Sequence, residues 1–131
     1  DNDQRSVTIE CASELTEPYA MKPEVYSALV ELCADICRRN GKRKLVWIAD
    51  RDKALEYSAK SDEMLLTVHR WFAKKSCPGN WLMERLGCLA QELTAGLGNK
   101  GDLRIYKSRQ DTCRLKPSSL NQKFPRLDSM I

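Results

Sequence analysis

The single histidine of the chain and one of its six cysteines stand eight residues apart, in the stretch HRWFAKKSCPG at residues 69–79. Neutral imidazole and thiolate are both zinc ligands, and a catalytic zinc site usually has three protein ligands with water in the fourth position. His69 and Cys77 would supply two of the three. Pro78 and Gly79 follow directly and predict a turn that folds the loop back, so that both side chains could converge on one ion.

Taken alone, this spacing is a weak signal. For a histidine at the end of a strand, beside a turn, the residues alone favour a hydrogen-bonded structural role over a metal ligand. Lys75, two residues before Cys77, would then be one more exposed lysine in a charged loop. From the residues themselves, both a metal site and a strand that runs into a turn remain open.

The segments before this stretch predict the elements that position it. Residues 6–12 (SVTIECA) alternate with the period of a strand, and this places Glu10 on the face opposite Val7 and Ile9. Residues 22–41 have helical spacing of apolar residues, with a proline in the first turn and a glycine at the stop. Residues 44–49 (KLVWIA) are typical of a buried strand, so the order predicts a parallel pair with a helical crossover.

Two further elements flank the histidine. Residues 64–69 (MLLTVH) predict a short strand that ends at His69, after a charged segment at 50–63 that could be a short helix or a loop. Residues 80–98 predict a second helix with a leucine stripe, with Asn80 as N-cap and Gly98 as stop. The leucine stripe is interpreted as core.

These elements predict an α/β fold with a mixed sheet flanked by helices. Residues 1–98 form the patterned part, and residues 99–131 have no sustained period and are interpreted as a basic linker or tail, with one stray strand at 103–106. The tail beyond residue 101 carries the whole net charge of +4. A nucleic-acid footprint would be clustered on a folded face, so we expect no specific nucleic-acid partner.

The remaining composition indicates a chain with a conventional core. The apolar runs are far shorter than the ~20 residues that span a bilayer, so no membrane span is expected, and DNDQRSVT does not have the pattern of a signal peptide. Cys33, Cys37 and Cys88 fall on apolar helix faces, where thiols pack as small hydrophobes. Half of a metal site at Cys33 and Cys37 is the alternative.

The stretch TVHRWFAKKSCPGNWL resembles the C-terminal metal-binding segment of zinc-dependent N-acetylmuramoyl-L-alanine amidases of type 2, the family that includes the peptidoglycan recognition proteins. RSVTIECAS and the helix after it are similar to the central strand and following helix of that family. The resemblance covers roughly residues 2–97, with both segments in the family's order.

The resemblance implies roles at four positions. His69 and Cys77 would be zinc (Zn²⁺) ligands, Glu10 would orient or deprotonate a zinc-activated water, and Lys75 would stabilise the oxyanion. The implied reaction is hydrolysis of the amide between N-acetylmuramic acid and L-alanine in peptidoglycan. The implied setting is a secreted or cell-wall-associated bacterial or prophage protein that degrades the wall.

One departure from the family matters. Its members have a further histidine ligand on an earlier strand, and this chain has no second histidine. We therefore expect an N-terminally truncated amidase domain, its independent activity in doubt. The alternative is a non-catalytic peptidoglycan-binding module or an inactive fragment. Trp71, Trp81 and Tyr19 could line a sugar or peptide groove, or belong to the core.

Overall fold

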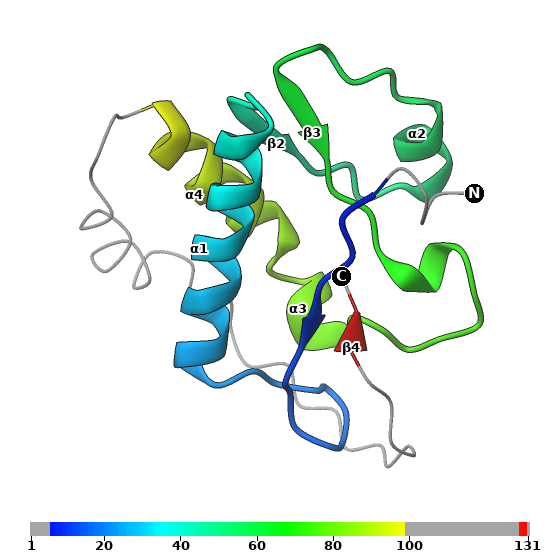
Figure 1. The fold of residues 1–131 in the computed structure, drawn as a ribbon. Coiled ribbons are helices and arrows are strands. Elements are labelled where there is room, and N and C mark those ends of the chain that lie inside the picture. The colour runs from blue at the N-terminus through cyan, green and yellow to red at the C-terminus, as the bar shows by residue number, and fades with distance from the viewer. Residues whose placement is uncertain (1–5, 99–128, 131) are drawn as a thin grey trace.

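Two helices, α1 (Pro23–Arg39) and α4 (Leu86–Gly98), pack against each other on one side of the fold (Figure 1). The structure is a computed structural model that describes residues 6–98 and 129–130. α1 confirms the predicted helix, with Pro23 in its first turn and basic residues in its last turn, where they complement the helix dipole. The two helices bury a common set of residues: Leu29, Val30, Cys33, Ala34, Leu86, Leu89, Ala90 and Leu93.

Two small sheets lie beside these helices. β2 (Lys44–Val46) and β3 (Glu63–Leu65) form a parallel pair, and the short helix α2 (Arg51–Glu56) lies in the connection between them. α4 packs on β2. β1 (Glu10–Cys11) pairs antiparallel with β4 (Ser129–Met130). The architecture is therefore α/β, with a parallel pair and an antiparallel pair.

The predicted strand pairing is wrong. The strand at 6–12 was expected to pair with the one at 44–49, but β1 pairs with β4 and β2 pairs with β3. The parallel and antiparallel pairs also lie in separate two-stranded sheets and not in one mixed sheet. Polarity patterns identify strands without identifying their partners, because pairing joins segments that are distant in the sequence.

The second predicted helix is divided. α3 (Asn80–Met83) and α4 are separated by Glu84 and Arg85. Arg85 folds back, donates to the carbonyl of Trp81 at 2.8 Å and places its guanidinium 4.0 Å from the centre of that indole ring. Asn80 is not the N-cap, because Gly79 occupies that position.

The cysteines follow the prediction with one exception. Cys33 and Cys37 are buried reduced thiols, and burial, followed by the nearby Cys37 and Cys11, raises the pKa of Cys33 to about 12. Cys88 is disulfide-bonded, so its prediction as a small apolar thiol is wrong.

Within the described part of the chain, no helix is long and apolar enough to cross a membrane. The predicted strand at 103–106 lies outside the described residues.

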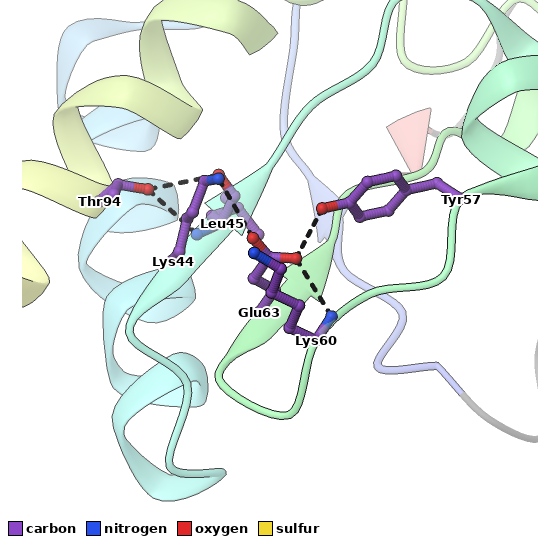
Figure 2. Close-up of polar contacts among 6 residues, drawn as sticks. All are labelled: Lys44, Leu45, Tyr57, Lys60, Glu63 and Thr94. Atoms are coloured by element: carbon purple, nitrogen blue, oxygen red, sulfur yellow. Dashed lines mark hydrogen bonds and ion pairs between the residues drawn. The ribbon is translucent and has the colours of Figure 1, made fainter.

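Helix α4 completes the hydrogen bonding of strand β2. The Leu45 N–H donates to Thr94 Oγ1 at 3.0 Å, and the Thr94 hydroxyl donates to the Leu45 carbonyl at 3.3 Å (Figure 2). Backbone polar groups in a buried strand need partners, and one threonine here satisfies both groups of Leu45, which is buried. Thr94 therefore fixes the strand to the helix.

The substitution Thr94→Val tests this attachment. Valine keeps the shape of threonine but leaves the Leu45 N–H without its acceptor, so we expect a loss of about 1–3 kcal/mol in the free energy of unfolding. Urea unfolding followed by circular dichroism measures it. The exposed Thr8→Val is the control. An unchanged stability of Thr94→Val would contradict the assignment of these hydrogen bonds.

The carboxylate of Glu63, at the start of β3, bonds both to β2 and to the segment that connects β2 with β3 (Figure 2). The side chain of Glu63 is 5% exposed, accepts from the Tyr57 hydroxyl at 2.6 Å and the Lys60 N–H at 3.1 Å, and forms an ion pair with Lys44 Nζ at 3.2 Å. The bond from Tyr57, then those from Lys60 and Lys44, lower the pKa of Glu63 to about 2. The hydrogen bond to Glu63 in turn raises the pKa of Tyr57.

The lowered pKa of Glu63 predicts a specific acid sensitivity. Because its pKa is 4.5 ordinarily and about 2 in the fold, the stabilisation is complete above about pH 4.5 and is lost as the pH falls toward 2. We expect Glu63→Gln to lower stability at neutral pH and to flatten its decline between pH 4.5 and 2. Urea unfolding across this range measures both, with the exposed Glu56→Gln as control. Parallel curves for Glu63→Gln and the wild type would contradict the assignment.

Candidate functional site

His69 lies beyond the carboxyl end of β3, where it opens the single-turn 3-10 helix η2 (His69–Trp71). Its carbonyl accepts from the N–H groups of Phe72 at 2.9 Å and Ala73 at 3.2 Å, which fixes the backbone of the turn. The side chain is partly buried. Its imidazole makes no hydrogen bond to another described residue, so the expectation of a hydrogen-bonded structural histidine is not met there.

The carboxyl ends of the two parallel strands meet at a pair of tryptophans. Trp47 follows β2, Trp71 closes the turn of His69, and their rings stack with centroids 5.2 Å apart and planes within 6°. Both are partly buried and pack against the core. Ligand sites of open parallel sheets lie at the carboxyl ends of the strands, and His69 is at this end.

Arg70 closes the loop that runs from His69 to Cys77. Its backbone N–H donates to the Cys77 carbonyl at 3.1 Å, and its Nε donates to the same oxygen at 3.4 Å. The two terminal nitrogens donate to the Ser76 carbonyl and, at 3.3 Å, to Asn80 Oδ1. The planar guanidinium thus binds three successive parts of the returning chain, and the fork geometry of arginine suits this arrangement.

The turn after Cys77 is packed against the segment before α1. Gly79 has φ 85°, and a Cβ there would stand 2.8 Å from Tyr19 Cβ and 3.1 Å from the Pro18 carbonyl. The Trp81 N–H donates to that carbonyl at 3.0 Å. Only glycine has both the conformation and the space, so the turn that Pro78 and Gly79 predicted is present and is held by close packing.

Cys77 is 3% exposed and lies close to Cys11 of β1. Burial, followed by the nearby Cys77 thiol, raises the pKa of Cys11 to about 11. Cys11 and Ile9 pack against the core, as the alternation of residues 6–12 predicted, and Glu10 is exposed on the other face. Strand β1 therefore contributes Cys11, and not Glu10, to the surroundings of Cys77.

The structure brings some of the predicted site residues together and not others. His69 and Cys77 are the two ends of one loop whose backbones are in contact through Arg70. Lys75 is exposed within that loop, where its N–H donates to the Ala73 carbonyl at 2.8 Å. Among the described residues, no hydrogen bond or ion pair joins Glu10 or Lys75 to the two candidate ligands.

The donor types suit zinc, but the donor set is incomplete. An imidazole and a buried thiol are suitable zinc ligands. Within residues 6–98 and 129–130, however, there is no group of three or more histidine, cysteine, aspartate or glutamate side chains that could hold a metal ion. His69 and Cys77 are therefore two donors that need at least one more.

No protein-family model, curated protein or solved structure matches this chain. Its functional assignment therefore depends on the geometry of the loop and on the sequence resemblance.

Arg70 and Cys11 are the neighbours that sequence reasoning missed. Arg70 stands directly after the histidine, but its main acceptors are the backbone carbonyls of Ser76 and Cys77, so the residue types gave no signal of its role. Among the candidate groove residues, Tyr19 is 3% exposed and belongs to the core. Trp81 is partly buried and contacts the Tyr26 ring edge-on at 5.8 Å.

Replacing Arg70 tests whether it holds the loop. We expect Arg70→Met to cost about 1.5–3 kcal/mol in the free energy of unfolding, because it removes charged hydrogen bonds to three groups. Arg70→Lys keeps the positive charge but has no planar guanidinium, so it should recover only part of the stability that Arg70→Met loses. Urea unfolding measures the stability, and mass-spectrometric mapping of thiol labelling at Cys77 measures the opening of the loop.

The exposed Arg51→Met is the control for loss of a positive charge. Faster labelling of Cys77 in Arg70→Met, but not in Arg51→Met, is the expected pattern. Equal labelling rates in all variants would show that close packing at Gly79 holds the loop without Arg70.

Proposed function

We propose that this chain is part of a zinc-dependent amidase that cleaves the bond between N-acetylmuramic acid and L-alanine in peptidoglycan. The observation that supports it is the loop that follows β3, which contains His69, Lys75 and Cys77 and is closed by the hydrogen bonds of Arg70 to Ser76 and Cys77. Pre-organised side chains on a fixed segment are what a hydrolytic site requires. The resemblance of residues 67–82 to the family's metal-binding segment gives the reaction class.

His69 and Cys77 would hold the zinc ion together with a donor that the described residues do not supply. When bound, zinc supplies a water whose pKa is near neutrality and a Lewis acid for the carbonyl oxygen. Cys77 would bind as the thiolate, and its buried position protects a metal–sulfur bond from solvent. The hydrogen bonds of Arg70 join the backbone of the turn at His69 to that of Cys77, and this limits how far the two donors can separate.

Glu10 has the chemistry for proton transfer, and Lys75 has the charge to stabilise an oxyanion. Glu10 is an exposed carboxylate on β1, and it would accept a proton from the attacking water and return it to the leaving amine of L-alanine. Lys75 is an exposed ammonium on the loop, and it would stabilise the negative charge that develops on the amide oxygen. Substrate binding would have to bring these two groups to the same amide.

A non-catalytic peptidoglycan-binding module is the second candidate. The observation that favours it is the count of donors, because the described residues offer two where a hydrolytic zinc site usually has three. Binding to the polymer could use the same loop without cleavage. Both functions would place the protein at a bacterial cell wall.

Release of new L-alanine amino termini from purified peptidoglycan tests the amidase. We expect release in zinc buffer that a chelator abolishes. Lys75→Met should lower kcat by about 10²–10³-fold, as for the loss of one oxyanion donor, and Glu10→Gln by about 10²–10⁴-fold. The adjacent exposed Lys74→Met is the matched control and should retain the wild-type rate.

The other outcomes separate the two functions. Release that the chelator leaves unchanged would contradict the zinc mechanism. Retention on insoluble peptidoglycan without any release would favour the binding module. Equal losses in Lys74→Met and Lys75→Met would remove Lys75 from the site and indicate a general charge effect.

A further inference from the structure

Charge is segregated along the folded part of the chain. Residues 6–37 hold six acidic residues and one lysine, whereas residues 38–44 (RRNGKRK) hold five basic residues and no acidic one. The overall neutrality of residues 1–101 conceals this separation. A segment with such a composition produces a local positive potential even in a neutral domain.

The structure fixes this segment in one place. The Lys42 N–H donates to the Cys37 carbonyl at 2.8 Å, and the Arg43 and Lys44 N–H groups donate to the Asp62 carbonyl at 2.7 and 3.2 Å. Lys42 Nζ also donates to the Ser61 carbonyl at 2.8 Å. The end of α1, the start of β2 and the loop before β3 are thereby joined into one edge.

Four basic residues on this edge keep their charge uncompensated: Arg38, Lys42, Arg43 and Lys60. Two neighbours do not, because Arg39 pairs with Asp35 at 2.8 Å and Lys44 pairs with Glu63 at 3.2 Å. Within the described residues, no carboxylate lies within ion-pair distance of the four. Asp62, in the adjoining turn, and the carboxyl end of the α1 dipole reduce the positive potential without cancelling it.

This basic edge lies at the end of the sheet opposite the candidate site. β2 and β3 run parallel from the edge, where Lys44 and Glu63 lie (Figure 2). Trp47 follows the other end of β2, and His69 lies beyond the other end of β3. The edge and the loop of His69 are therefore at the amino and carboxyl ends of the same strands. A ligand on the edge would leave the loop accessible.

We propose that the basic edge, formed by Arg38, Lys42, Arg43 and Lys60, binds a phosphodiester-linked anionic polymer of the cell wall. Guanidinium groups match phosphate oxygens in geometry, and several fixed cations along one edge suit a repeating anion. The choice of a wall polymer rests on the proposed function. Binding there would hold the chain on the wall while the opposite end meets peptidoglycan.

The edge has the charge for nucleic acid but not the other features. Single-stranded nucleic acid is bound on aromatic platforms, and residues 38–44 and 60–62 contain no aromatic residue. Tyr57, in the same connection, is partly buried and bonded to Glu63. A polymer recognised through its phosphates alone fits this edge better.

The test compares two double variants of the full chain. Arg38→Gln with Arg43→Gln removes two charges from the edge, and Arg51→Gln with Lys53→Gln removes two exposed charges from α2, near the other end of the sheet. Binding is measured by cosedimentation with cell walls that carry a phosphodiester polymer and with walls stripped of it by hydrofluoric acid. The basic residues beyond 101 are the same in all variants, so differences report the edge.

We expect the edge variant to bind polymer-bearing walls about tenfold more weakly. The slope of the logarithm of its binding constant against the logarithm of salt concentration should be smaller in magnitude by about two. The α2 variant should stay within about twofold of the wild type, and stripped walls should bind all three equally weakly. Equal losses in both variants, or an edge effect that persists on stripped walls, would overturn the proposal. Tighter binding of a DNA duplex than of the walls, lost in the edge variant, would overturn it in favour of nucleic acid.

The hydrolysis assay is independent of this result. Edge-dependent binding without release of L-alanine termini would keep the edge and reject the amidase. If release is chelator-sensitive and the edge variant binds walls as the wild type does, the amidase proposal stands and the proposal for the basic edge is rejected.

Discussion

Burial of the leucine face of α4 and of the preceding turn is the interaction on which the rest of the fold depends. Leu82, Leu86, Leu89 and Leu93 are at most 1% exposed, and this surface contacts both α1 and β2. β2 in turn carries β3, and β3 leads to His69. Since each fully buried leucine contributes about 1.5–3 kcal/mol, this packing fixes the strands from which the loop at residues 69–79 begins.

The helices could be predicted from the sequence because their signals are local. The apolar spacing, Pro23 and the basic last turn defined α1, and the leucine stripe defined most of α4. The break between α3 and α4, where Arg85 folds back over Trp81, had no such signal. Strand partners were not predictable either, since β1 pairs with Ser129–Met130, far away in the sequence.

The candidate site was predictable by residue type and only partly by arrangement. His69 and Cys77 were found from their chemistry, and the turn between them from Pro78 and Gly79. The contact that closes the loop comes from Arg70, two of whose three acceptors are backbone carbonyls and leave no trace in the residue types around it. The proximity of Cys11 to Cys77 depends on where β1 lies, and strand placement is what the sequence pattern could not supply.

The stacked tryptophans have a consequence for how the parallel pair can move. Trp47 and Trp71 follow different strands, and their rings are parallel to within 6°. A slip of β3 by one residue along β2 would move the chain that leads to Trp71 by about 3.3 Å relative to Trp47 and offset the two rings. The stacked indole pair therefore opposes a shift in register. The coupling of its rings, seen by near-ultraviolet circular dichroism, would report whether the two strands are aligned.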